Sequence, residues 1–238
     1  MSIVSVIEYK GDNKTVVWKH PMVDFDSSTE LVVRESQEAI FFLDGVALDS
    51  FRAGRHVLET GKLPLLSNKM FGKLLGGDVF RSEVYFINLV EQMNVKWGIR
   101  PKIKFTERTR GGDYQFELGM MGAMSIKIVE PRKILLNWVG GENALGQVKL
   151  MSYINPLINQ HLRTYMSNYF DEQCISIFDI EKKTDDIAKE VKKRLNEEIL
   201  LYGIEISSFF IERFLFPEED EVYRKIKEIK GKKITETM

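Results

Sequence analysis

The chain up to Leu58 consists of short apolar runs that are separated by polar or glycine-containing turns. Runs of β-branched and aromatic residues of this length predict strands. We expect residues 5–8 and 15–19 to form a strand pair around Gly11. We also expect 31–33 and 39–43 to form a hairpin across the polar residues between them.

A tight turn at Asp44 and Gly45 should lead into a further strand over 46–51, because glycine readily adopts the positive φ that such turns require. Gly54 then ends that strand. Residues 62–77 are apolar without alternation, and we interpret them as an irregular segment. Three more strands are expected, over 83–89, over 95–99 and around 103–105.

Strict alternation of apolar and polar residues is clearest over 114–120 and resumes over 124–128. This period predicts strands with one buried face. We expect the two stretches to form an antiparallel pair joined near Gly122.

Helical spacing begins after Pro131. Asn155 and Pro156 have the residue types of an N-cap and a first helical position, and apolar or aromatic residues follow at intervals of four, namely Leu157, His161, Tyr165 and Tyr169. A second helix should start at Thr184 or Asp185 and stop at Gly203. A strand over 204–216 and a helix opened by Pro217 complete the chain, and that helix is acidic at its start and basic at its end.

The N-terminal order of elements resembles the start of the SPFH domain, or band 7 family, of stomatins, prohibitins and flotillins. The resemblance rests on an E-x-Q-A turn, a strand ending in glycine and an Ala-Gly-x-His element. The matching residues are Glu35, Gln37, Ala39, Gly45, Ala53, Gly54, Arg55 and His56. Later stretches are similar to a soluble bacterial branch of that family that lacks a transmembrane helix.

The C-terminal order is similar to the end of the same domain. There the matches are Leu195 with Asn196, Tyr202-Gly203-Ile204, and Phe216-Pro217-Glu218-Glu219. The resemblance implies an α+β fold, a twisted and mainly antiparallel sheet with packed helices and a C-terminal helical segment. It implies an SPFH domain over 1–216 and a helix over 217–238 that could begin an oligomerisation segment.

Composition narrows the classes of function. The 238 residues carry 34 basic and 35 acidic side chains, so we expect no nucleic-acid partner. One cysteine, Cys174, excludes an internal disulfide, and we expect it to be structural. The N-terminus has no signal-peptide pattern, and no window reaches the roughly 20 apolar residues of a membrane-spanning helix.

No residues have the spacing of a catalytic or metal site. His20, His56 and His161 have no partner at metal-ligand spacing, and we expect no cofactor. We interpret His56 as bonded to a turn carbonyl and His161 as a core or interface residue. A hydrolytic site at Asp24, Asp26 and Glu30 is the weakest alternative.

Two groups of residues are candidates for contact with lipid. The first is the apolar segment around Leu65, Leu66, Met70 and Phe71, which could dip into a membrane interface or pack on the sheet. The second is a basic run that could meet anionic headgroups or form a solvated strand face, with Lys96, Arg100, Lys102 and Lys104 as its candidates.

The helical residues supply a candidate oligomer interface. One stripe must be buried against the chain's own sheet or against a partner, and consists of Ile187, Val191, Leu195 and Ile199. The last helix could extend that interface through Val222, Ile226 and Ile229.

The resemblance implies a non-enzymatic scaffold that self-assembles on the cytoplasmic face of a bacterial membrane. Members of this branch organise membrane patches and recruit membrane-stress or quality-control proteins. The alternative is a soluble module that binds an anionic ligand or nucleic acid and has no membrane role. Vesicle binding separates the two hypotheses.

Overall fold

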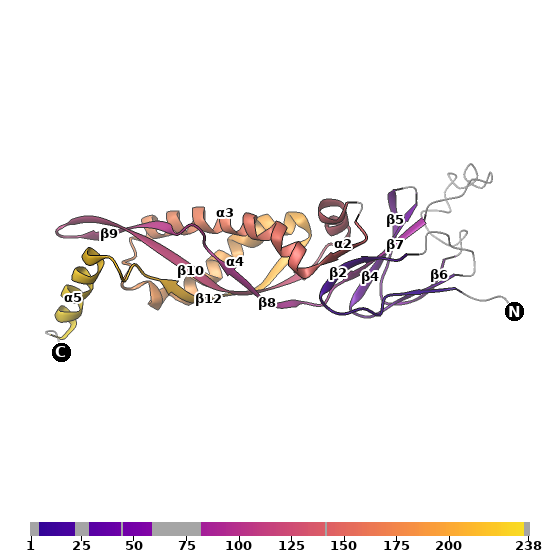
Figure 1. The fold of residues 1–238 in the computed structure, drawn as a ribbon, viewed down its shortest axis with the longest axis horizontal. Coiled ribbons are helices and arrows are strands. Elements are labelled where there is room, and N and C mark those ends of the chain that lie inside the picture. The colour runs from indigo at the N-terminus through magenta and orange to yellow at the C-terminus, as the bar shows by residue number, and fades with distance from the viewer. Residues whose placement is uncertain (1–4, 22–28, 44, 59–81, 141, 236–238) are drawn as a thin grey trace. The chain divides into compact units, whose positions relative to one another are not determined.

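The structure, a computed structural model, describes residues 5–21, 29–43, 45–58, 82–140 and 142–235. The chain divides into two compact units. Unit 1 comprises Met1–Gln92, Lys127–Tyr153 and Ile199–Glu205, and unit 2 comprises Met93–Ile126, Ile154–Glu198 and Ile206–Met238. Sheets with mainly antiparallel pairing and packed helices confirm the expected α+β class (Figure 1).

Unit 1 contains two sheets. The first has the order β1-β3-β6, and its strands are β1 (Val6–Glu8), β3 (Glu30–Val33) and β6 (Gly54–Val57). The second has the order β11-β2-β7-β4-β5, and its strands are β2 (Thr15–Lys19), β4 (Gln37–Leu43), β5 (Val46–Phe51), β7 (Ser82–Asn88) and β11 (Ala144–Gly146). Residues of both sheets share one hydrophobic core, among them Ile7 and Leu31 from the first and Phe41 and Phe86 from the second. Burial between paired sheets explains why the strand signals are strong here.

Both pairings expected near the N-terminus are wrong, although the strands themselves are present. β1 pairs in parallel with β3, whereas β2 pairs with β7 and β11. β3 and β4 lie in different sheets, so the polar residues between them carry the chain from one sheet to the other instead of turning it back. The hairpin around Gly45 is confirmed, with φ of 78° at Gly45 and Ala39 opposite Phe51.

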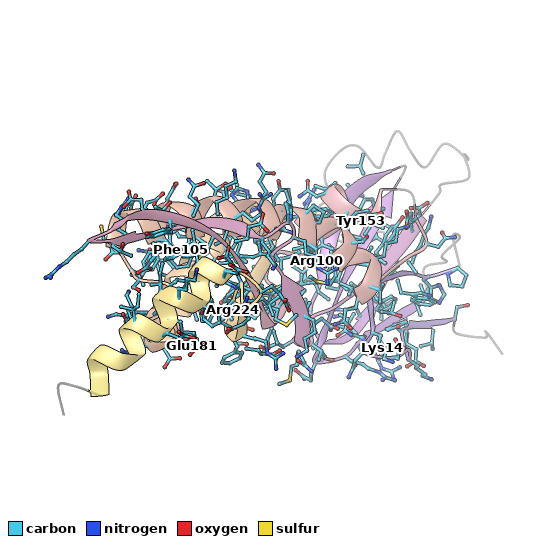
Figure 2. All side chains as sticks on the ribbon, turned by 60° about the vertical axis from the view of Figure 1, so that its left-hand side comes forward. Lys14, Arg100, Phe105, Tyr153, Glu181 and Arg224 are labelled. Carbon is cyan, nitrogen blue, oxygen red and sulfur yellow. The ribbon has the colours of Figure 1, made fainter. Side chains whose placement is uncertain are left out.

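Unit 2 is built on four strands and two long helices. The strands are β8 (Gln92–Gly98), β9 (Ile103–Thr109), β10 (Gly112–Ile128) and β12 (Ile204–Leu215), in the order β12-β10-β8 with β9 also paired to β10. The helices are α3 (Gln147–Gln173), whose residues up to Tyr153 belong to unit 1, and α4 (Thr184–Ile199). Phe105 of β9, labelled in Figure 2, is buried with its ring 4.9 Å from that of Phe170 on α3. The core of this unit therefore lies between sheet and helices.

β10 is one continuous strand of 17 residues, so the expected turn near Gly122 is wrong. Glycine is required there for a different reason. A Cβ atom at Gly122 would lie 1.9 Å from the carbonyl oxygen of Phe210 on β12 and 2.9 Å from the Trp97 ring. Such close approach of two backbones admits only a residue without a side chain.

α3 begins at Gln147, eight residues before the expected cap, and Pro156 lies inside it. The buried face is also shifted by one position from the expected one. Its buried residues are Ile154, Ile158, Leu162, Met166 and Phe170, whereas Leu157, His161, Tyr165 and Tyr169 are half-buried. His161 is therefore not a core residue.

α4 starts where expected and ends at Ile199, and Asn196 near its end fixes β12. The Asn196 side chain donates to the Ile206 carbonyl at 3.0 Å and accepts from the Ile206 amide at 2.8 Å. A single-turn 3-10 helix, Leu200–Tyr202, follows α4, and Gly203 stops it with φ of 81°. This left-handed stop confirms the role expected for Gly203.

Several short elements were not predicted from the sequence. They are α2 (Pro131–Ile134), a π-helix at Leu135–Val139, and a 3-10 helix at Ile180–Lys183. The last helix, α5 (Glu221–Thr235), starts four residues after Pro217. Asp220 supplies the cap instead, since its side chain accepts bonds from the amides of Val222 and Tyr223 at 2.8 and 3.0 Å.

Gly122→Ala should lower the free energy of unfolding by about 1–3 kcal/mol, because the added methyl group forces β10 and β12 apart. Urea denaturation followed by circular dichroism measures the change. Gly111→Ala is the matched control, because a Cβ atom there meets no other atom closer than 3.8 Å. Equal stability of the two variants would contradict the close-approach explanation.

Candidate functional site

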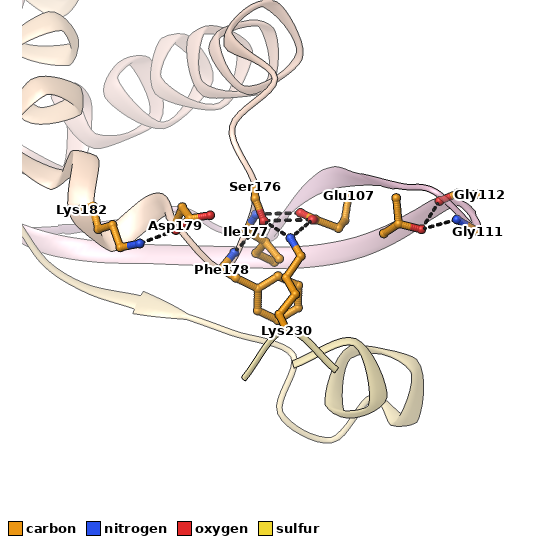
Figure 3. A network of polar contacts seen from close by, with 10 residues as sticks. Glu107, Gly111, Gly112, Ser176, Ile177, Phe178, Asp179, Lys182 and Lys230 are labelled. Carbon is orange, nitrogen blue, oxygen red and sulfur yellow. Dashed lines mark hydrogen bonds and ion pairs between the residues drawn. The ribbon is translucent and has the colours of Figure 1, made fainter. Parts of the chain in front are cut away.

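A buried network of hydrogen bonds links α5 to the rest of unit 2 through Glu107 on β9. Its carboxylate is 1% exposed and accepts bonds from the Ser176 hydroxyl at 2.9 Å and the Ile177 amide at 2.8 Å. The Lys230 ammonium group of α5 lies 2.7 Å from the same carboxylate (Figure 3). A buried carboxylate is tolerated only with such partners, so this network holds α5 in place.

An aromatic cluster supports the same docking. Tyr223 of α5 is 2% exposed, and its ring stacks on Phe178 and Phe216 at centroid distances of 5.1 and 6.2 Å. Burial raises the pKa of Tyr223 to about 12. The Lys230 ammonium group also lies 4.8 Å from the centre of the Phe178 ring. The buried face of α5 therefore combines stacking, cation–π contact and an ion pair.

A neighbouring face of α5, roughly 100° around the helix, leaves apolar side chains in contact with solvent. Val222 is 41% exposed and Ile229 is 58% exposed, while Ile226 between them is half-buried. The spacing of these three residues places them on neighbouring positions of the helix surface. This face is the part of the predicted oligomer interface that the fold leaves accessible.

The α4 part of that predicted interface is inaccessible. The side chains of Ile187, Val191, Leu195 and Ile199 are between 0 and 2% exposed. The sequence analysis left two alternatives open, burial against the chain's own sheet or against a partner. Burial within the chain agrees with the first. A partner could reach them only by unfolding α4.

The basic run separates into paired and unpaired cations. Lys96 forms an ion pair with Glu212 at 2.7 Å, and Arg108 lies 3.7 Å from Asp171. Arg100, Lys102 and Lys104 are exposed and line a hollow of about 790 Å³ between the start of β9 and one face of α3. The sequence indicated these three cations but not the helix residues that complete the hollow.

The sequence analysis did not identify two residues that line the hollow, Arg163 and Asn159. Both come from α3 and line the hollow, 59 or more residues away from Arg100 along the chain. Placing α3 correctly would have put them on one polar face of the helix at a spacing of four. Glu107 had a clearer signal, since the alternation that buries Ile103 and Phe105 continues to position 107.

The family-motif residues occupy structural positions. Gln37 is buried and donates to the Tyr9 carbonyl at 3.4 Å, whereas Glu35 is exposed. The His56 Nε2 atom lies 2.8 Å from the Arg52 carbonyl oxygen, which confirms the expected bond to a turn carbonyl. Gly54 has φ of 142°, and Pro217 accepts a bond from the Asp220 amide at 3.0 Å.

Other candidates lie outside the described residues or carry no visible chemistry. Leu65, Leu66, Met70 and Phe71 fall outside the described residues, as do Asp24 and Asp26. Cys174 is exposed at a positive φ of 49°, and not buried as expected of a structural cysteine. Within the described ranges, no group of three or more histidine, cysteine or acidic side chains could hold a metal ion.

No helix in the described part of the chain is long and apolar enough to cross a bilayer. The model of the SPFH domain-Band 7 family matches residues 17–234. The chain is also 20% identical over 219 residues to the uncharacterized protein YdjI of Bacillus subtilis strain 168. That match covers 92% of this chain, which spans about two thirds (65%) of the relative's length.

Lys230→Ala should lower the free energy of unfolding of unit 2 by about 1.5–3 kcal/mol, because the buried Glu107 carboxylate loses a charged partner. Hydrogen exchange of the α5 amides, read beside urea denaturation, checks this. Lys182→Ala, which removes an exposed pair with Asp179, should change stability little. If α5 exchanged at the wild-type rate in Lys230→Ala, the network would not be what holds the helix.

Proposed function

The chain belongs to the SPFH domain–Band 7 family, and on that premise we propose that it is a non-enzymatic, membrane-associated scaffold that assembles through α5. The observation that carries the proposal is that two neighbouring faces of this helix differ in exposure. One face is fixed by Tyr223 and Lys230, while Val222 and Ile229 are exposed on the face beside it. A helix that is held in place and has an exposed apolar face is pre-organised to pack against a second copy.

Membrane contact is proposed through the exposed cations of unit 2. Arg100, Lys102 and Lys104 are free of carboxylate partners among the described residues and can meet anionic headgroups. The contact would be peripheral, on the cytoplasmic face of a bacterial membrane. Membrane-stress or quality-control proteins are the proposed partners of the assembled scaffold.

The second candidate is a soluble module that binds an anionic ligand without a membrane role. The hollow lined by Arg100, Lys102 and Lys104 favours it, because a concave site with several cations suits a small anion as well as a lipid headgroup. The two candidates differ in whether the protein binds vesicles and whether it forms large species.

Flotation of the purified chain with anionic and neutral vesicles tests the proposed function. We expect a fraction bound to anionic vesicles that is larger than a monomer, because membrane contact and self-assembly should occur together. A monomer that stays at the bottom of the gradient with both lipids would favour the soluble module.

Val222→Ser combined with Ile229→Ser should reduce the size of the assembly while changing the free energy of unfolding by no more than about 0.5 kcal/mol. Both side chains are exposed, so their loss affects packing between copies more than packing within one copy. Light scattering measures the size. Val148→Ser, at an exposed valine of α3 in unit 1, is the control and should leave the assembly intact.

Lys102→Glu combined with Lys104→Glu should weaken binding to anionic vesicles by about 1 kcal/mol per charge. Cosedimentation over a series of lipid concentrations gives the partition coefficient. Unchanged binding would remove the basic run as the lipid contact and leave the membrane association to be explained by another surface.

A further inference from the structure

A second hollow of unit 2 lies between α3 and α4. Its volume is about 330 Å³, and its lining comes from residues 161–172 of α3 and residues 191–198 of α4. The two helices are neighbours here, since the Cζ atom of Arg194 lies 6.0 Å from the centre of the Tyr165 ring. We call this hollow the α3–α4 groove. It follows α3 for about three turns, which is the form of groove that can receive a further helix.

Aromatic rings line the α3 side of this groove. Tyr165 and Tyr169 are half-buried, and the centres of their rings lie 5.7 Å apart. The two residues are four apart, so both rings lie on one side of α3. The buried side chains of Val191 and Leu195 line the groove from α4. Half-exposed tyrosine rings offer apolar surface with a polar end, and they are enriched where proteins bind one another.

The charge of the groove favours a basic occupant. Three carboxylates line it, from Glu172, Glu197 and Glu198, against the single guanidinium group of Arg194. Arg194 lies 3.7 Å from Glu197, whereas Glu172 and Glu198 are exposed and have no ion-pair partner among the described residues. The negative field of these two carboxylates therefore attracts a cation from outside the chain's own fold.

The exposed face of α5 has the complementary chemistry. Val222 and Ile229 are seven residues apart, which is about 10 Å along the helix axis. The aromatic row from His161 to Tyr169 has a similar length of about 12 Å. Lys225 is exposed on the same side of α5, three residues after Val222 and four before Ile229. An apolar stripe with a cation beside it thus matches an aromatic groove with carboxylates beside it.

A single folded copy does not make this contact with itself. Tyr223 and Lys230 hold α5 in a position where Val222 and Ile229 remain exposed. The Tyr165 ring likewise remains partly exposed in the same structure. Because both surfaces are accessible at once, a contact between them must join two copies of the chain.

We propose that α5 of one copy docks into the α3–α4 groove of a second copy. The inference rests on the proposed assembly through α5 and adds the surface that receives this helix. The two surfaces differ, so the contact is heterologous, and each copy presents one helix and one groove. Copies therefore add head to tail, and the size of the assembly increases with protein concentration.

Glu172→Lys combined with Glu198→Lys tests the groove. Both residues are exposed, so the variant should fold, and thermal melting checks this. Sedimentation velocity over a series of concentrations measures self-association. We expect its dissociation constant to rise about tenfold or more, because Lys225 of the arriving helix then meets two cations instead of two carboxylates.

Glu35→Lys combined with Glu117→Lys is the matched control. It makes the same change of net charge at two exposed carboxylates that lie outside the groove. This control should assemble like the wild-type chain. If the control and the groove variant lost assembly equally, net charge alone would explain the effect and the proposed docking would be wrong.

A mixing experiment tests whether the contact joins two different surfaces. The groove variant keeps an intact α5, and Val222→Ser with Ile229→Ser keeps an intact groove. Neither should assemble by itself. Their equimolar mixture should form a one-to-one pair and nothing larger, because a single helix–groove contact is available. If α5 paired with α5 instead, the groove variant would assemble by itself, and that result overturns the groove.

The remaining outcomes separate this inference from the proposed function. A wild-type chain that assembles, together with a mixture of variants that stays monomeric, overturns the groove and leaves assembly through α5 standing. A wild-type chain that is monomeric at every concentration, in solution and on anionic vesicles, overturns both. We expect the groove variant to float with anionic vesicles as a monomer, since the exposed cations Arg100, Lys102 and Lys104 are unchanged.

Discussion

Unit 2 depends on a single constraint, the pairing of β10 along both of its edges. β12 occupies one edge, while β9 and β8 share the other, with Gly112 to Leu118 facing β9 and the Met120 carbonyl bonded to the Ile99 amide. β10 therefore lies between neighbouring strands, and its middle approaches them closely. Gly122 meets that requirement, since only a residue without a side chain fits beside the Phe210 carbonyl. The sheet in turn supplies the inward positions that α3 and α5 cover.

One of those inward positions holds a charge. Glu107 follows Ile103 and Phe105 on the buried face of β9, so the fold places a carboxylate where its strand would otherwise bury an apolar residue. Removing a carboxylate from water costs several kcal/mol unless partners compensate for it. Three partners do so here, and one of them, Lys230, belongs to α5. The last helix is therefore held in position by the ion pair between Lys230 and Glu107 as well as by apolar packing.

Local patterns predicted the elements much better than they predicted the pairing of those elements. The strands around Gly45, the start of α4 and the helical stop at Gly203 depend on neighbouring residues alone, and the structure confirms them. The partners of β1 and β3, and the continuity of β10, depend on which residues meet across the core, and spacing along the chain does not encode that. Likewise the basic run was visible in the sequence, but its completion by Arg163 requires α3 to lie beside β9.

The pair formed by Glu107 and Lys230 joins positions 123 residues apart, and this has a consequence for how the sequence can change over evolutionary time. Replacing both residues with apolar side chains of similar volume could leave the fold as stable as before. Replacing only one of the two leaves either a buried carboxylate or an ammonium group without its ion-pair partner. Each single substitution therefore gives a protein with a lower free energy of unfolding. The two positions should therefore vary together or not at all among related chains.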